Sequence, residues 1–124
     1  MAQSVLIVDD EKDLADTCAR LLRRAGFECL VAYGFEEALS LFDSNRPALV
    51  LSDLTLPTGN GFEVARHVRK SAPDTRIVLM TAYHSANAEQ EAVLAGADGY
   101  LRKPFQNAEL IATIKSLIVP DGHA

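Results

Sequence analysis

The distribution of apolar residues restricts the fold of this chain more than any other feature of the sequence. Segments of helical period alternate with five short apolar runs, at residues 5–8, 28–32, 48–51, 76–80 and 99–101. Such alternation is typical of parallel strands joined by crossover helices. The first, third and fourth runs are apolar almost throughout, as expected for strands that helices cover on both faces. The pattern therefore predicts an α/β protein with a doubly wound, five-stranded parallel sheet.

Two of the connecting segments have clear helical faces. The first face is formed by Leu14, Cys18, Leu21, Leu22 and Ala25. Gly26 follows and can end this helix in a left-handed conformation. The face of the last helix is formed by Leu110, Ile111, Ile114, Leu117 and Ile118. Asn107 can cap this helix, which we expect to end before Pro120, and weaker faces around Phe35 and Phe62 predict two more helices.

The segment from residue 86 to residue 95 has helical propensity but little to bury. Its large apolar side chains are Val93 and Leu94, and its other apolar residues are alanines. A helix that buries so little apolar surface is expected to be held weakly. This segment completes a set of five predicted helices.

The length of the chain fits one domain. A chain of 124 residues can bury roughly two thirds of the surface that its unfolded form exposes. We expect the domain to span residues 1–119. Residues 120–124 are polar and are expected to form a tail or the start of a linker, so the chain is compatible with a stand-alone protein and with the front part of a longer protein.

Composition excludes several classes of protein. The chain has 12 Lys and Arg against 17 Asp and Glu, a net charge of -5, which argues against direct binding to nucleic acid. Cys18 and Cys29 match neither a zinc pattern nor a disulfide framework, which favours a reducing compartment. The first apolar run stops at Asp9 and is too short for a signal sequence or a membrane span. We therefore expect a cytoplasmic location without membrane association.

Polar side chains follow or end four of the predicted strands. They are Asp9 and Asp10 at the first, Asp53 at the third, Thr81 at the fourth and Lys103 at the fifth. Right-handed crossovers bring the carboxyl ends of parallel strands to one edge of the sheet, where ligands of such folds collect. We therefore expect all five side chains to lie at this edge.

The residue types at this edge indicate phosphoryl chemistry. Three carboxylates a few ångströms apart repel one another, and unless they are protonated they need a hard cation between them. An all-oxygen ligand set completed by water suits Mg²⁺, with Mn²⁺ as an alternative metal. One carboxylate can then attack a phosphoryl group, while the metal, the Thr81 hydroxyl and the Lys103 ammonium group neutralise the phosphoryl oxygens.

Four short motifs lie at the ends of the predicted strands, and they are Val8-Asp9-Asp10-Glu11, Asp53-Leu54-Thr55-Leu56-Pro57 with Gly61, Thr81-Ala82 and Lys103-Pro104-Phe105. They resemble the motifs of the receiver domains of two-component response regulators. Each motif alone is weak, but the four in this order are highly specific, and the resemblance covers nearly the whole chain. It implies a flavodoxin-like sheet with strand order 2-1-3-4-5 and five helices.

The resemblance implies that the chain is a phospho-accepting signalling switch. Asp53 would accept a phosphoryl group from a sensor histidine kinase or a histidine phosphotransfer protein, and the change would be passed to an output domain or protein. Asp10, Asp53 and the backbone carbonyl of Thr55 would bind Mg²⁺, with Asp9 acting mostly through water. Such a switch catalyses its own phosphorylation and dephosphorylation but turns over no external substrate.

The same resemblance implies how the signal would spread. Thr81 and Lys103 would hold the phosphoryl oxygens, Tyr100 would be the aromatic switch, and the Lys103–Pro104 peptide bond would be cis. We hypothesise that movement of Thr81 lets Tyr100 turn inward, which biases residues 86–95 and the surface shared with the fifth strand and the last helix. Dimerisation on phosphorylation is compatible with this scheme.

Two residues depart from those typical of the family's best-known members. Thr55 lies two residues after Asp53, and Tyr83 lies two residues after Thr81. Both would flank the path by which water reaches the phosphoryl group. We expect them to tune the lifetime of the phosphorylated state, with the ring of Tyr83 hindering the water.

Two other classes of function compete with this interpretation. A phosphatase of the haloacid-dehalogenase type also works through an aspartyl-phosphate, but it needs a second carboxylate where this chain has Thr55. A pure binding module would be either a flavodoxin-like FMN carrier or a receiver that is not phosphorylated. The acids after the first strand would repel FMN, and a colourless purified protein would exclude the flavin.

Overall fold

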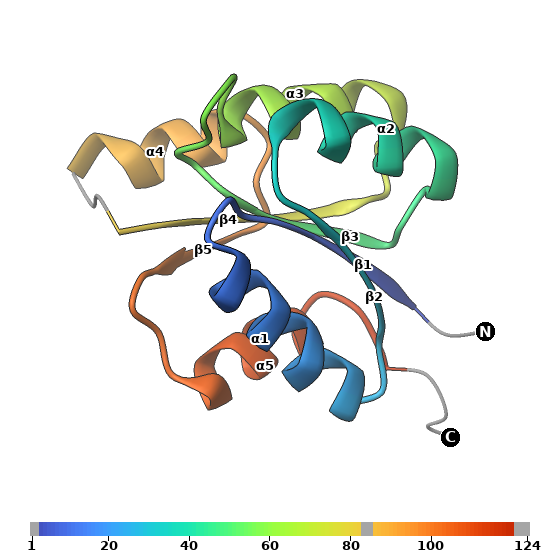
Figure 1. Cartoon of the computed structure of the whole chain (residues 1–124). Helices are drawn as coiled ribbons and strands as arrows, with labels where there is room; N and C mark the ends of the chain where they lie inside the picture. The colour runs from blue at the N-terminus through green and yellow to red at the C-terminus, as the bar shows by residue number, and fades with distance from the viewer. Residues whose placement is uncertain (1–2, 83–85, 121–124) are drawn as a thin grey trace.

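The computed structural model describes residues 3–82 and 86–120. Within these ranges, one parallel sheet is formed by β1 (Ser4–Val8), β2 (Glu28–Ala32), β3 (Leu49–Asp53), β4 (Arg76–Thr81) and β5 (Gly99–Arg102). The strands lie in the order β2-β1-β3-β4-β5, which confirms the predicted order (Figure 1). Each predicted apolar run overlaps one strand.

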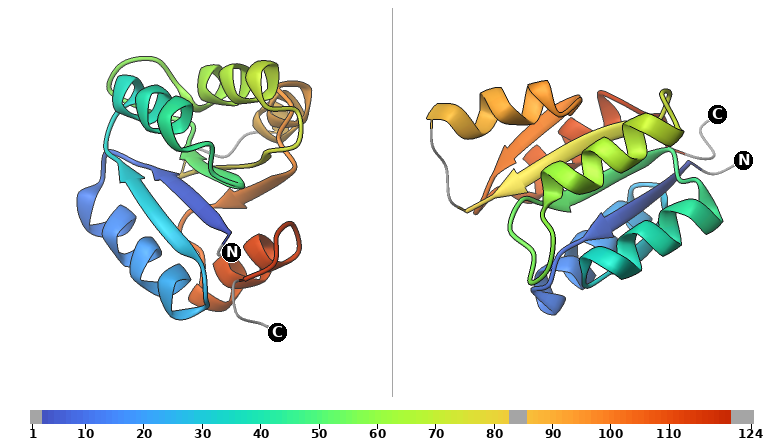
Figure 2. Two further views of the ribbon diagram at one scale, coloured as in Figure 1. Left: turned by 90° about the vertical axis from the view of Figure 1, so that its right-hand side faces the viewer. Right: turned by 90° about the horizontal axis from the view of Figure 1, so that it is seen from above.

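The described ranges also contain α1 (Lys12–Arg24), α2 (Phe35–Asn45), α3 (Gly61–Ser71), α4 (Ala86–Leu94) and α5 (Asn107–Lys115). The helices α1 and α5 cover one face of the sheet, and α2, α3 and α4 cover the other (Figures 1 and 2). This is the predicted doubly wound arrangement. None of the helices in the described ranges is long and apolar enough to cross a membrane.

Helix ends agree only partly with the predictions. Gly26 has a φ of 104°, the left-handed conformation expected after α1. In contrast, α5 ends at Lys115, so Ile118 is buried without being helical. The N-cap of α5 is Gln106, in extended conformation, and Asn107 is already helical. Apolar spacing overestimates the length of α5 because the segment that follows the helix still packs against the core.

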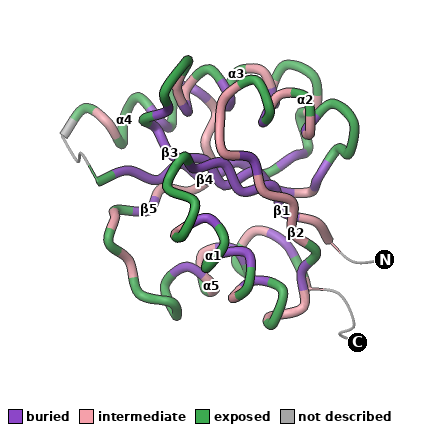
Figure 3. Tube along the Cα trace, in the orientation of Figure 1, coloured by how far each residue is buried: buried purple, intermediate pink, exposed green. Residues whose placement is uncertain are grey.

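Alternate residues of each strand enter two hydrophobic cores. Val5 and Ile7 of β1 pack in the core that contains residues of α1 and α5. Leu6 and Val8 pack in the core that contains residues of α2 and α3. Figure 3 shows the central strands of the sheet, β1, β3 and β4, as the buried layer between the helices. A sheet buried on both faces leaves its edges as the places where polar groups can gather.

The strand register determines which residues meet at the carboxyl edge of the sheet. Val8 is level with Ser52 of β3, so Asp9 and Asp53 each follow this pair by one residue. Thr81 is level with Arg102 of β5. Thr81, Asp53, Asp9 and the residue after Arg102 therefore share one edge, as predicted from the positions of the strands.

Helix α4 packs lightly against the sheet. Ala92 is buried, whereas Val93 is 66% exposed and Leu94 is 84% exposed. The helix therefore offers a small alanine surface to the core, and its two large apolar side chains face solvent. The expected small burial of this segment is confirmed.

Candidate functional site

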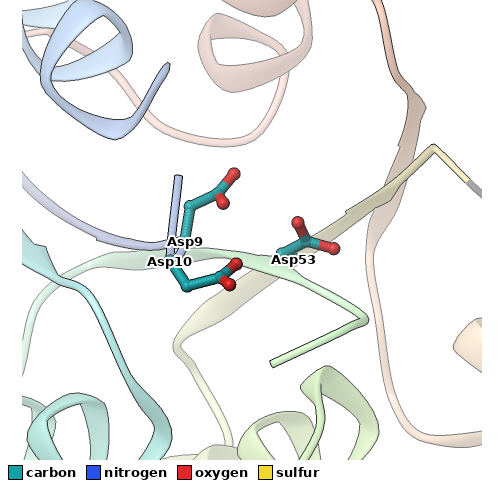
Figure 4. A group of neighbouring side chains, drawn as sticks. All are labelled: Asp9, Asp10 and Asp53. Carbon is teal, nitrogen blue, oxygen red and sulfur yellow. The ribbon is translucent and has the colours of Figure 1, made fainter. Parts of the chain in front are cut away.

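Three carboxylates converge at the carboxyl edge of the sheet. One oxygen from each of Asp9, Asp10 and Asp53 lies within 4.8 Å of the others. Figure 4 shows the three side chains directed toward the same space, two from the end of β1 and one from the end of β3. Asp9 and Asp53 are buried, and Asp10 is exposed. The predicted convergence of the acidic residues is confirmed.

Lys103 lies among these carboxylates. Its Nζ donates to Oδ2 of Asp53 at 2.6 Å and to Oδ2 of Asp9 at 2.7 Å. It also lies 3.3 Å from Oε1 of Glu11. The Lys103–Pro104 peptide bond is cis, as the resemblance implied. With its side chain only 7% exposed, Lys103 is a nearly buried cation held by carboxylates from two other strand ends.

Burial and charge act in opposite directions on the site residues. Burial raises the pKa of Asp9, the hydrogen bond from Lys103 lowers it, and the pKa stays above its ordinary value. For Lys103, burial lowers the pKa, but the bonds to Asp53 and Asp9 raise it well above its ordinary value. Lys103 therefore remains positively charged at neutral pH. One ammonium group faces the three carboxylates of the cluster, so the edge favours an additional cation.

The backbone after Asp53 orients its carboxylate. The Thr55 N–H donates to Oδ1 of Asp53 at 3.0 Å, while Oδ2 accepts from Lys103. The side chain of Thr55 is exposed. Asp53, Thr55 and Lys103 line an open pocket of about 220 Å³ together with Asp10 and Ala82. Asp53 therefore forms part of the wall of a pocket and is not enclosed entirely in the hydrophobic core.

Thr81 and Tyr100 are the remaining predicted site residues that the structure describes, and they belong to β4 and β5. Thr81 ends β4 and is buried; it lines an adjoining pocket of about 320 Å³, which it shares with Thr55. Tyr100, in β5, is half-buried and packs against the core that contains residues of α2 and α3. Tyr83 lies outside the described residues.

Glu11 is a site residue to which sequence reasoning gave no role. It is exposed, yet its carboxylate is the third to approach Lys103. Its backbone N–H also donates to Oδ1 of Asp9 at 3.0 Å. The available signal was its place directly after Asp10 in the first motif, because residues after a strand end share the same edge.

Gly61 lies directly against the backbone of Asp53 and Leu54. A Cβ atom added at Gly61 would lie 2.5 Å from the carbonyl oxygen of Asp53 and 2.9 Å from Cα of Leu54. Both are backbone atoms, which cannot move without shifting Asp53 itself. The start of α3 therefore packs directly against the chain that carries the central carboxylate.

Gly61→Ala is expected to lower the free energy of unfolding by about 2 kcal/mol, because the added methyl group overlaps the backbone. Urea denaturation measures this change. Gly34→Ala is the matched control, since a Cβ atom there meets nothing within 4 Å. We expect the control to change stability by at most about 0.5 kcal/mol. Equal losses in the two variants would contradict the packing of Gly61 against Asp53.

The fold and the acidic edge together define a flavodoxin-like α/β domain with a candidate cation site. The model of the family described as the response regulator receiver domain matches residues 5–115. The chain therefore belongs to the response regulator receiver domain family.

Solved structures agree with this assignment. A CheY-like receiver domain protein from Methanospirillum hungatei JF-1 is 29% identical, with a TM-score of 0.90 over 94% of this chain and 93% of that one. The chemotaxis protein CheY4 of Vibrio cholerae is 31% identical, with a TM-score of 0.90 over 95% of this chain and all of the other. A response regulator from Burkholderia pseudomallei, solved with a phosphorylated aspartic acid, a calcium ion and citrate, is 31% identical. Its TM-score is 0.84 over 94% of this chain and 67% of that one.

Proposed function

We propose that this chain is a phosphorylation-dependent signalling switch in which Asp53 accepts a phosphoryl group from a histidine kinase or a histidine phosphotransfer protein. The observation that carries the proposal is the way in which the carboxylate of Asp53 is held. Lys103 and the Thr55 N–H each bind one of its oxygens, and Asp9 and Asp10 lie beside it. A carboxylate fixed in this way is an oriented nucleophile that lines an open pocket.

In the proposed reaction, an oxygen of Asp53 forms a bond to phosphorus. The bond from phosphorus to the leaving group breaks, and the leaving group keeps the electron pair. With a phosphohistidine donor this group is the imidazole nitrogen. Lys103 remains cationic and neutralises the charge on the transferring oxygens, and Thr81 contributes its hydroxyl once it turns toward them.

The donor set fits a hard divalent cation. Asp9, Asp10 and Asp53 supply carboxylate oxygens within 4.8 Å of one another, and we propose that the backbone carbonyl of Thr55 completes the protein ligands. When bound, Mg²⁺ would neutralise negative charge at the transferring phosphoryl group. Mn²⁺, which also accepts oxygen ligands, would be an alternative.

The experiment that tests this proposal is an intact-mass measurement after incubation with acetyl phosphate. With Mg²⁺ present, we expect the mass to rise by one phosphoryl group. With EDTA in place of Mg²⁺, the uncompensated carboxylates repel the anionic donor. The rate of phosphorylation should then be lower by at least about 10²-fold. A protein that stays unmodified in the presence of Mg²⁺ would exclude the proposed function.

The affinity for Mg²⁺ is expected to fall as the pH is lowered. Burial raises the pKa of Asp9, so this carboxylate takes up a proton at a higher pH than an exposed aspartate does. The bound proton then competes with the metal, by up to about tenfold per pH unit below the pKa. Calorimetric titration with Mg²⁺ at several pH values measures the effect. Asp9→Asn should bind more weakly and with less pH dependence, and an identical dependence in both proteins would contradict this prediction.

A groove beside Lys103 is the proposed docking site for the phosphohistidine donor. It has a volume of about 300 Å³ and is lined by Glu11, Leu14, Ala82, Lys103, Pro104 and Phe105. Three of these side chains, on α1 and in the loop before α5, are large and apolar. Because the groove shares Lys103 with the pocket at Asp53, a partner bound there would hold its phosphohistidine near the acceptor.

Phe105→Ala is therefore expected to slow transfer from a phosphorylated histidine kinase by about tenfold or more, through loss of an apolar anchor. The rate with acetyl phosphate should stay within about twofold, since this donor needs no docking surface. Radiolabel transfer from a panel of purified kinases gives the first rate, and intact mass gives the second. Equal slowing with both donors would show a general defect of the site and contradict the docking role.

We further propose that phosphorylation acts on α4 and its neighbours. The phosphoryl group would draw Thr81 inward, Tyr100 would fill the space that it leaves, and the surface of α4, β5 and α5 would change for an output domain, a protein partner or a second copy. The light packing of α4 supports this, because a helix with little buried surface changes position at low cost. An unchanged Tyr100 rotamer on binding a phosphoryl mimic would contradict the coupling.

Thr55 and Tyr83 are proposed to set the lifetime of the phosphorylated state. Tyr83→Ala should then increase the rate of dephosphorylation.

A further inference from the structure

Arg69 joins three segments at the edge of the sheet opposite the acidic site. It lies in the last turn of α3. Its Nη1 donates to the carbonyl oxygens of Pro73 at 2.6 Å and Thr75 at 2.9 Å. Its Nη2 donates to the carbonyl oxygen of Gly96 at 2.7 Å and to Oδ2 of Asp98 at 2.9 Å. One guanidinium group therefore ties the loop before β4 to the loop between α4 and β5.

Asp98 extends this connection into the sheet. Its Oδ2 also accepts from the N–H of Ile77, near the start of β4, at 2.9 Å. Its own N–H donates to the carbonyl oxygen of Ile77 at 2.7 Å. Arg76 lies 3.6 Å from the other carboxylate oxygen. The loop after α4 is thus fixed to the amino end of β4 by backbone and side-chain bonds together.

The C-terminal end of α4 has a geometry that fits this attachment. The Gly96 N–H donates to the carbonyl of Val93, and the Ala97 N–H donates to the carbonyl of Ala92, a Schellman arrangement. Gly96 has a φ of 98°, and a Cβ atom there would lie 3.1 Å from Nε of Arg69. Glycine therefore permits both the left-handed turn and the close approach of Arg69. Ala92 and Ala95, which are buried, lie at this same end.

We infer that Arg69 is a positioning residue that holds the C-terminal end of α4 as a fixed pivot, so that the change produced by phosphorylation is confined to the part of α4 nearer Thr81. The inference rests on the proposed function. Asp53, Thr81 and Lys103 lie at the carboxyl edge of the sheet, whereas the Arg69 bonds lie at its amino edge. A phosphoryl group at Asp53 makes no contact with these bonds and leaves them in place.

The shape of the guanidinium group matters for this role. Four acceptors from two loops surround it, and a planar fork of donors can reach all of them at once. A lysine ammonium group at this position could donate hydrogen bonds to one or two of the carbonyl groups. Arg66, on the same helix, is exposed and is the matched position for a control substitution.

Amide hydrogen exchange followed by NMR on the full chain tests the inference. In the wild type, we expect beryllofluoride with Mg²⁺ to change exchange at Ala95, Gly96 and Ala97 by less than about twofold, and at residues 88–91 by more than about tenfold. Without the mimic, Arg69→Met should exchange at least about tenfold faster at residues 95–97. Arg69→Lys should show a smaller increase, about threefold, and Arg66→Met none. Unchanged amides of β1 and β3 would confirm that the variants are folded.

Two results would overturn the pivot. In the first, the amide exchange rates of residues 95–97 stay at their wild-type values in both Arg69 variants. In the second, the mimic changes the exchange rates of residues 95–97 in the wild type as strongly as those of residues 88–91. Failure of the proposed function gives a different result, because a mimic that does not bind leaves the amides of Asp53 and Lys103 unshifted. In that case phosphorylation would produce no change for the pivot to confine, and the comparison without mimic would still decide whether Arg69 holds the end of α4.

Discussion

Asp53→Asn is expected to abolish the gain of a phosphoryl group from acetyl phosphate, a loss of more than about 10³-fold in rate. The substitution keeps the size of the side chain but replaces the attacking carboxylate oxygen with a weakly nucleophilic amide. Lys103 keeps its bond to Asp9, so the fold around the site should remain. Intact mass after a fixed incubation with donor and Mg²⁺ measures the result.

Asp74→Asn is the matched control for this loss. Asp74 is exposed in the loop before β4, at the amino edge of the sheet. The same chemical change there alters the net charge by the same amount without touching the acidic cluster. We expect wild-type phosphorylation in the control. A mass gain in Asp53→Asn comparable to that of the wild type would place the acceptor elsewhere.

Lys103→Met is expected to lower the free energy of unfolding by about 3 kcal/mol in the presence of EDTA, the typical cost of removing one partner from a buried ion pair. The substitution leaves Asp9 and Asp53 buried beside Asp10 without a cation. Urea denaturation gives the change, and Mg²⁺ should restore part of it by binding to the carboxylates. Lys115→Met, on the exposed face of α5, should leave stability almost unchanged.

The pH dependence of the Lys103→Met variant follows from the same charges. The pKa of Asp9 is already raised by burial, and loss of Lys103 raises it further. The folded state then binds more protons than the unfolded state above the ordinary pKa of aspartate. The stability of the variant should therefore fall as the pH rises through this window and recover as it is lowered. If the Lys103→Met variant were as stable as the wild type, with or without EDTA, Lys103 would not be the cation that compensates the buried carboxylates of Asp9 and Asp53.

The fold could be predicted from the sequence because the signals were redundant. Each strand of the sheet is marked by its own apolar run, and the positions of Asp9, Asp53 and Lys103 after such runs predict their meeting. Parallel topology converts a position along the chain into a position at one edge. The strand order itself came from the resemblance to receiver domains.

The remaining features depend on contacts that no local pattern encodes. The bonds from Arg69 to Gly96 and Asp98 span 27 and 29 residues and involve an ordinary helical arginine. The approach of Glu11 to Lys103 depends on the direction of one exposed side chain. The end of α5 was misjudged because Ile118 is buried outside the helix. Such details depend on packing in three dimensions rather than on residue type or spacing.

The most direct test of the account is to locate the phosphoryl group chemically. Borohydride reduces an acyl phosphate to an alcohol, so a phosphorylated aspartate becomes homoserine. After treatment with acetyl phosphate, Mg²⁺ and borohydride, peptide sequencing by mass spectrometry should find homoserine at position 53 alone. Homoserine at another aspartate, or aspartate unchanged at position 53 in protein that has gained a phosphoryl group, would contradict the assignment of Asp53 as the acceptor.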